Sequence, residues 1–240
     1  MRTCILCRCL AWLVERESPG WIQDVEEQIQ ALSYRGLNTD ALFEQDADPV
    51  RLRQIHELWS SDPSQAFNEF RLLAKGGSVW SMLQVGTALE IGVGTPVDLE
   101  QAEQWYRTAN ASGSDTALLR LGYFAYKRGD PVEAKAILAA GVERGLTPAM
   151  RHLAWVELKL VGTPEARDRA RILYEKAIGL GDLRARVDLA HAMAHGYFGW
   201  RKIPTGLRAV YAAAGQLLGE MEQGKNKAPS PVRRANAKTI

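Results

Sequence analysis

Cysteine is scarce in this sequence, with three residues in 240, all within the first ten positions. Cys4, Cys7 and Cys9 form an odd, clustered set, so they cannot cross-link a folded domain. The run offers three thiolates, whereas a closed structural zinc site needs four ligands. The nearest histidine is His56, far along the chain. We therefore expect neither a disulfide framework nor a metal site in this region.

Motifs that mark enzyme active sites are also missing. The sequence has no G-x-S-x-G element, no Walker loop and no dinucleotide-binding fingerprint. His191 and His195 have a spacing that can chelate a metal on a helix. However, Ala192 stands where a zinc hydrolase motif would have glutamate. We expect no catalytic residues, no cofactor and no metal. A hydrolytic site built from the histidines is the enzymatic alternative.

Outside the C-terminal tail, basic residues do not outnumber acidic ones. From Gln223 to Ile240 the chain carries five basic residues and no acidic one, whereas the whole chain has a formal net charge of +2. The remainder is therefore mildly acidic, at −3. A nucleic-acid-binding fold would be expected to carry a basic stripe, so we expect no nucleic-acid partner. The polar, proline-bearing tail is predicted to be disordered. A basic tether for an acidic surface or membrane is its functional alternative.

The apolar segment from Cys4 to Val14 is too short to span a bilayer. It has eleven residues and contains Arg8, whereas a spanning helix needs about 20. No A-x-A-like cleavage site follows it, which argues against a secretory signal. We expect a cytoplasmic protein. The alternative is an envelope-associated or periplasmic accessory protein, held by this segment and the basic tail.

The sequence does contain an internal repeat. Its clearest unit covers residues 80–113, where small and apolar residues recur at helical spacing in two segments, 81–89 and 102–110. The glycine- and proline-bearing run 92–96 between them is typical of a turn. Asp98 is placed to cap the second helix, because its carboxylate can accept from unpaired backbone amides.

The same frame returns three more times. A bulky pair marks the second helix of each unit: Trp105-Tyr106, Ile137-Leu138, Leu173-Tyr174 and Val210-Tyr211. The first members are 32, 36 and 37 residues apart, and an earlier unit places Glu69-Phe70 in the same frame. A single helix pair cannot bury its apolar face alone, so we expect neighbouring units to stack into one core. Trp105, Tyr106, Tyr174 and Tyr211 belong to that core by phase. The glycines expected to end helices in the left-handed conformation are Gly113, Gly145 and Gly181.

These residues resemble the Sel1-like repeat, a relative of the tetratricopeptide repeat. The resemblance lies in the order Ala-x3-Leu-Gly-x2-Tyr-x2-Gly, a G-x-G turn, Asp, and Ala-x2-Trp-Tyr-x2-Ala-Ala-x2-Gly. It covers residues 66–219 and is strongest over 77–113. Leu89 stands where the family prefers tyrosine, and Arg128 and Leu218 stand where it has glycine. The resemblance implies an all-α, right-handed α-solenoid of stacked antiparallel helix pairs that acts as a protein-interaction scaffold.

The chain divides into three predicted parts. Residues 1–47 form a helical capping region, residues 48–222 form the repeat solenoid, and residues 223–240 form the disordered basic tail. In the capping region, Ile22, Val25, Ile29 and Leu32 have the spacing of an amphipathic helix. Asp48 and Pro49 are predicted to cap and begin a helix, and Pro63 to begin its partner.

The candidate binding site is the concave groove of the solenoid. First helices line the concave side in solenoids of helix pairs, and related tetratricopeptide proteins bind extended peptides there. By phase, the groove residues are Leu83, Thr87, Tyr123, Tyr126, Lys127, Arg151, Trp155, Lys159, Arg184, His191 and His195. This set is aromatic and cationic, so we expect a protein or peptide partner that carries carboxylate or aromatic groups. The alternative is that these side chains pack against the next repeat or face water.

Overall fold

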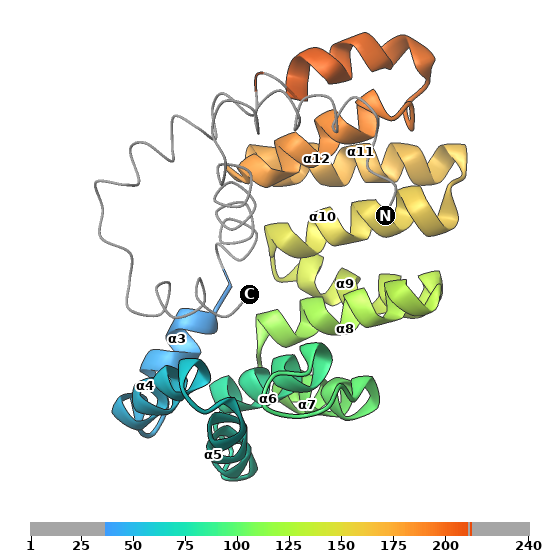
Figure 1. Ribbon diagram of the computed structural model, residues 1–240. Helices are drawn as coiled ribbons and strands as arrows, with labels where there is room; N and C mark the ends of the chain where they lie inside the picture. Colours follow the sequence, from blue (N-terminus) through green and yellow to red (C-terminus); the bar gives the residue numbers. More distant parts are fainter. Residues whose placement is uncertain (1–36, 211, 213–240) are drawn as a thin grey trace, which may run out of the picture. The chain divides into compact units, whose positions relative to one another are not determined.

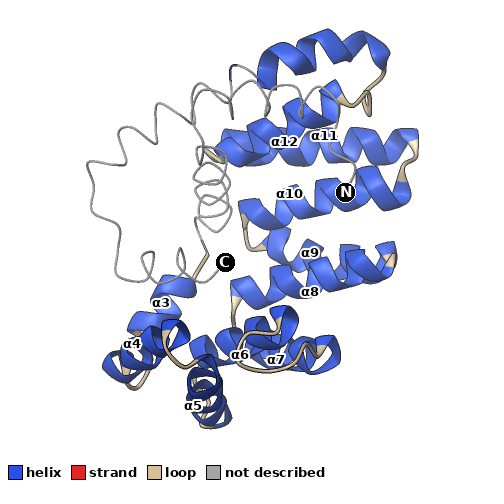
Figure 2. Ribbon diagram, in the orientation of Figure 1, coloured by secondary structure: helices blue, strands red, loops and turns tan. Residues whose placement is uncertain are grey.

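The computed structural model describes residues 37–210 and 212, and these form helices joined by turns, with no strand among them (Figure 2). Within this part, no helix combines the length and the apolar character needed to cross a membrane. The predictions for the N-terminal apolar segment, the amphipathic helix around Val25, Tyr211 and the basic tail lie outside the described residues. The three predicted parts of the chain and the cytoplasmic location therefore stay predictions.

The helices follow one another in antiparallel pairs, after a short α3 (Thr39–Glu44). The complete pairs are α4 (Pro49–Glu57) with α5 (Pro63–Lys75), α6 (Val79–Ile91) with α7 (Leu99–Ala111), α8 (Asp115–Arg128) with α9 (Pro131–Glu143), and α10 (Thr147–Val156) with α11 (Pro164–Gly179). They are followed by α12 (Leu183–Ala194) and a helical segment at 203–210. Short non-α turns lie at η1 (Leu58–Ser60), η2 (Glu157–Val161) and η3 (Trp200–Lys202).

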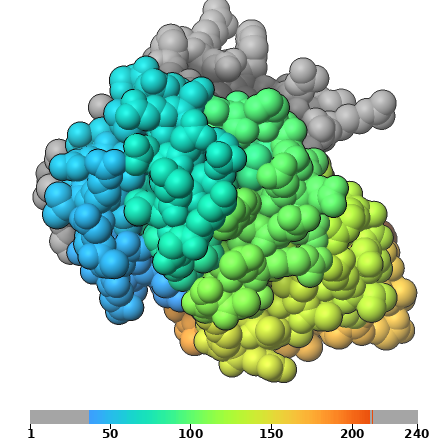
Figure 3. All heavy atoms as spheres, turned by 90° about the horizontal axis from the view of Figure 1, so that it is seen from below, coloured from blue at the N-terminus to red at the C-terminus, as the bar shows by residue number. Residues whose placement is uncertain are grey.

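Successive pairs pack against each other in chain order (Figure 1). Each helix from α4 to α11 contacts the next, and the first helix α10 also contacts the first helices α8 and α12. Seen from below, the side chains of successive blue, green and yellow segments form adjoining bands (Figure 3). The predicted all-α solenoid of stacked helix pairs is thereby confirmed.

The helix ends follow the predicted capping residues. The carboxylates of Asp48 and Asp98 each accept from the backbone amide three residues further on, and α4 and α5 begin at proline. The positive φ angles of Gly113, Gly145 and Gly181 are 90°, 78° and 86°. Because a left-handed residue without a Cβ avoids steric strain, glycine suits these helix ends.

In the pairs α6–α7 and α8–α9, a glycine of the first helix faces a bulky residue of the second. Tyr106 and Tyr174 are buried, as predicted, and so is Leu138. Trp105, which was also predicted to be in the core, is only partly buried against it. A Cβ on Gly86 would lie 2.7 Å from the Tyr106 ring, and a Cβ on Gly122 would lie 2.6 Å from Leu138. The two helices of a pair can approach this closely only because these positions lack a side chain.

One first helix departs from regular α-helical structure. In the third full unit, α10 is followed by the π-helical turn η2, which ends before Gly162. Between its opening alanine, Ala149, and the closing glycine it has one more residue than the equivalent stretch from Ala117 to Gly129. A π-helical turn accommodates one additional residue in a helix, which is the physical reason for the change.

The same turn buries a charged residue between two neighbouring second helices. Glu157 is buried, and its carboxylate pairs with Lys135 of α9 at 2.9 Å and with Arg169 of α11 at 2.7 Å. Burial alone would raise the pKa of Glu157, but the hydrogen bonds from Arg169 and Lys135 outweigh it and lower that pKa. The ionised carboxylate therefore links two successive pairs.

The close approach at Gly86 generates a stability prediction. Gly86→Ala is expected to lower the free energy of unfolding by about 1–3 kcal/mol, because the added methyl overlaps the ring of Tyr106. Gly179→Ala is the matched control, since Gly179 is helical with open space around its Cβ position. There alanine should be neutral or stabilising by up to about 1 kcal/mol. Urea unfolding followed by circular dichroism measures both changes, and equal effects would contradict the packing described.

Candidate functional site

The predicted groove residues lie on the first helices α6, α8, α10 and α12, on η2, and at the end of α12. The structure separates them by burial. Five are exposed: Tyr123, Lys127, Trp155, Lys159 and His195. Four are half-buried: Thr87, Tyr126, Arg184 and His191. Two are buried, namely Leu83 and Arg151.

The two buried residues correct the sequence prediction. Leu83 is only 4% exposed and belongs to the core cluster that includes Trp80 and Tyr106, so it contributes to packing between helices. Arg151 is also 4% exposed and is held by ion pairs. Helical phase placed both on the groove side, but the neighbouring helices cover them. Neither side chain is available at the surface.

Arg151 is the centre of an ion-pair network between α10 and α12. Its Nε lies 3.0 Å from Asp182 and its Nη1 lies 3.2 Å from Asp188. Asp188 also accepts from Arg184 at 3.1 Å. Taking a guanidinium out of water is costly unless it is paired, and these two carboxylates supply the pairing. The charge of Arg151 therefore holds adjacent helices together, and Arg184 pairs with Asp188 within α12.

Thr87 belongs to a second polar network, which connects α6, α7 and α8. Its hydroxyl lies 3.2 Å from that of Tyr106, and the Tyr106 hydroxyl donates to Glu90 at 2.9 Å. Arg120 pairs with the other oxygen of Glu90 at 3.5 Å. Burial raises the pKa of Tyr106 above its ordinary value, so its hydroxyl remains a donor. This network joins consecutive units.

The exposed residues form a surface of aromatic rings and lysines. We call Tyr123, Tyr126, Lys127, Trp155, Lys159 and Tyr197 the aromatic–lysine surface. The rings of Tyr123 and Tyr126 stack, with their centres 6.5 Å apart. The ammonium of Lys127 lies 5.8 Å from the centre of the Tyr123 ring.

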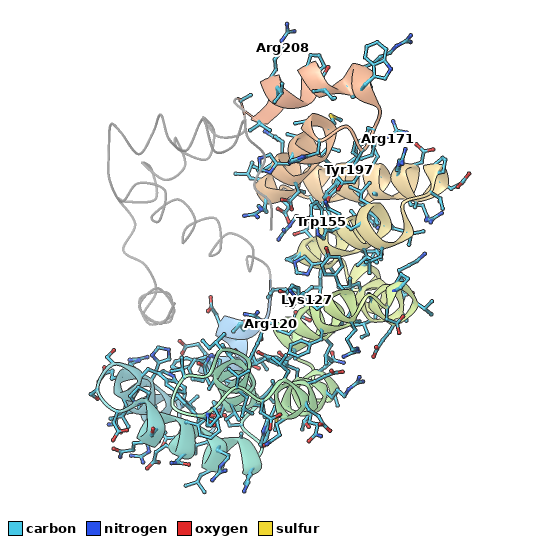
Figure 4. All side chains as sticks on the ribbon, turned by 45° about the vertical axis from the view of Figure 1, so that its right-hand side comes forward. Arg120, Lys127, Trp155, Arg171, Tyr197 and Arg208 are labelled. Carbon is cyan, nitrogen blue, oxygen red and sulfur yellow. The ribbon has the colours of Figure 1, made fainter. Side chains whose placement is uncertain are left out.

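Lys159 is held between two rings at the other end of this surface. Its ammonium lies 4.7 Å from the ring centre of Trp155 and 4.7 Å from that of Tyr197. It also donates a hydrogen bond to the Tyr197 hydroxyl. Figure 4 shows Lys127, Trp155 and Tyr197 in a row that runs from α8 past α10 to the segment after α12.

Sequence reasoning missed three residues of this region. Tyr197 follows α12, outside the repeat positions, so periodicity gives no signal for it. Arg120 and His152 were identifiable, because each lies three residues after the opening alanine of its first helix, at Ala117 and Ala149. Their equivalent in the last unit is Asp188, so this register position carries charged or polar groups in three consecutive first helices.

Two histidines of this region, His152 and His191, have a lowered pKa. Burial is the main reason that the pKa of His152 is lowered to about 3, and the nearby cations Arg151, Arg120 and Arg184 add to it. Burial likewise lowers the pKa of His191. No group of three potential metal-ligating side chains occurs within residues 37–210 and 212. The exposed residues can bind a ligand, because rings offer apolar and cation–π contacts and ammonium groups attract anions.

Comparisons with known proteins agree with this architecture. The model of the Sel1 repeat matches residues 81–114 and 147–182. A Sel1 repeat protein from Oxalobacter formigenes is 19% identical with a TM-score of 0.55, over 71% of this chain and 76% of that one. The antigen c5321 of uropathogenic Escherichia coli, which displays an SLR fold, is 21% identical with a TM-score of 0.54. That match covers 72% of this chain, which spans only 41% of the antigen. No curated protein matches the chain.

The Arg151 network generates a second prediction. Arg151→Met should lower the free energy of unfolding by about 3 kcal/mol, because it leaves Asp182 with an unpaired buried charge and weakens the pairing of Asp188. Arg171→Met is the matched control: Arg171 pairs with Asp168 at 3.5 Å on an exposed helix face. Its loss should change stability by less than about 0.5 kcal/mol. Denaturant unfolding of both variants measures the difference, and similar values would show that the network is not stabilising.

His152 generates a pH prediction. Its pKa is about 3 in the folded protein and about 6.5 when unfolded. The unfolded chain therefore takes up the proton first as the pH falls below 6.5, and folding stability decreases. Between pH 7 and pH 5, the free energy of unfolding of wild type should fall by about 2 kcal/mol more than that of His152→Gln. Urea unfolding at both pH values tests this. Parallel losses in the two proteins would refute it.

Proposed function

We propose that this chain, a protein with Sel1 repeats, is a non-catalytic scaffold that binds a partner protein or peptide on the concave side of its solenoid. Sel1 repeat proteins are generally protein-interaction scaffolds. The single observation that carries the proposal is the aromatic–lysine surface, which is formed by the first helices α8 and α10, by η2 and by Tyr197 after α12. In a helical solenoid, such a surface is extended and suits an extended partner.

The burial of the aromatic residues supports this reading. Tyr106 and Tyr174 are buried in the helix pairs, whereas Tyr123 and Trp155 keep 37% and 36% of their surface exposed. The exposed pair lies on first helices, and the buried pair lies on second helices. Tyrosine and tryptophan are the side chains that contribute most often to binding energy at protein interfaces. Exposed rings on one set of helices therefore favour a contact surface.

The neighbouring charges support binding over catalysis. Arg151 is held by carboxylates between α10 and α12, Arg184 is held by Asp188 within α12, and burial lowers the pKa of His152 and His191. A general base is most effective when its pKa lies near the working pH, and His152 is far from that range. The groups that remain exposed on this surface are rings and ammonium groups, which bind ligands rather than transfer protons.

A comparison of recovered partners tests the proposal. The double variant Tyr123→Ala/Trp155→Ala should lose partner proteins that wild type recovers, because it removes both exposed rings. Trp200→Ala is the matched control, since Trp200 is 74% exposed and lies in η3, outside the aromatic–lysine surface. The measurement is affinity purification followed by quantitative mass spectrometry, with folding checked by circular dichroism. Equal recovery by the folded double variant and wild type would reject this surface.

A further inference from the structure

The exposed aromatic and cationic residues occupy equivalent positions in successive units. Each first helix opens on a small residue, namely Ala117, Ala149 or Ala185. The sixth residue after it carries a ring in every case: Tyr123, Trp155 and His191. The tenth residue after it is basic in every case: Lys127, Lys159 and His195. A ring and a basic group four residues apart share one face of a helix. The three units therefore present one ring–base pair each.

The two lysines are not paired with acid in the part of the chain that the structure describes. Neither Lys127 nor Lys159 forms an ion pair with a described carboxylate, whereas Arg151 of α10 and Arg184 of α12 do. Each lysine instead lies over an aromatic ring. A cation–π contact at an exposed site contributes about 0.5–1 kcal/mol and leaves the positive charge in place. The surface thus combines exposed rings with uncompensated ammonium groups.

We propose that these ring–base pairs bind an extended acidic peptide segment of a partner protein, with one carboxylate on each lysine and one apolar or aromatic side chain on each ring. The inference rests on the proposed function and specifies the partner's chemistry. Lysine is a compact charge that suits a carboxylate, and the rings suit apolar groups. A nucleic acid fits less well, because the chain outside its tail has a net charge of −3.

The spacing of the pairs sets the spacing of the acidic residues. First helices α8 and α10 are in contact, as are α10 and α12. Packed helices have axes about 8–10 Å apart, and an extended chain rises about 3.3 Å per residue. Carboxylates about three residues apart therefore match successive pairs. A segment with an acidic residue at every third position should bind better than one whose acidic residues are adjacent.

Fluorescence anisotropy with synthetic peptides and the full chain tests the inference. The probe is a labelled peptide that repeats Glu-Phe-Ser three times, and the comparisons are a peptide of the same composition with adjacent glutamates and one with lysine for glutamate. The spaced acidic peptide should bind several-fold more tightly than the adjacent one, and its affinity should fall with added salt. The lysine peptide should not bind.

Charge-reversal variants identify the site. Lys127→Glu/Lys159→Glu should weaken the spaced peptide about tenfold or more, which corresponds to about 1.4 kcal/mol. The matched control is Lys176→Glu, an exposed lysine on the second helix α11, which should leave the affinity within about twofold. Circular dichroism checks that each variant is folded.

The outcomes separate this inference from the proposed function. Equal binding of spaced and adjacent peptides, or equal weakening by the control, would overturn the inference. So would lysine-dependent binding of phosphatidylserine vesicles or single-stranded DNA without peptide binding. If natural partners are lost in Tyr123→Ala/Trp155→Ala while no acidic peptide binds, the proposed function stands and the acidic class is wrong. If Tyr123→Ala/Trp155→Ala recovers natural partners as wild type does and no acidic peptide binds, the proposed function and the inference both fail.

Discussion

Close contact between a small residue on one helix and a bulky residue on its partner is the constraint on which the other features of this protein depend. Gly86 receives the ring of Tyr106, and Gly122 receives the side chain of Leu138. Because the second-helix side chain fills the space that a Cβ would occupy, the two helices pack with their axes close together. One bulky residue is buried within each pair, and the pairs can then stack through their remaining apolar faces.

Stacking leaves polar groups at the junctions between pairs, and the structure satisfies them with ion pairs. Glu157 joins α9 to α11 through Lys135 and Arg169, and Arg151 joins α10 to α12 through two aspartates. Such groups would be costly if they were buried alone, so each is matched by an opposite charge. This requirement determines which cations are available to a ligand. Arg151, Arg169 and Lys135 form the ion pairs at the junctions, and Lys127 and Lys159 remain on the surface.

The aromatic–lysine surface also depends on irregular structure at one end of a helix. The π-helical turn of η2 contains Lys159 and places Glu157 in the interior. Tyr197, from the segment after α12, contacts the Lys159 ammonium with its ring and its hydroxyl. A π-helical turn frequently marks a functional position, because it changes the direction of the side chains that follow. Here it serves both the junction and the exposed surface.

The sequence by itself determined the helix pairs, their ends and their order. Periodic apolar residues predicted the helices, and Asp48, Asp98 and the helix-ending glycines marked their limits, since these depend on local backbone chemistry. Phase also predicted that Tyr106 and Tyr174 are buried and placed Tyr123, Lys127, Trp155 and Lys159 on one face. Only the tertiary structure decided that Leu83 and Arg151 are covered, that Tyr197 reaches Lys159, and that a π-turn ends α10. The physical reason is that helical phase specifies a direction from one helix axis, whereas burial and pairing depend on the side chains of neighbouring helices.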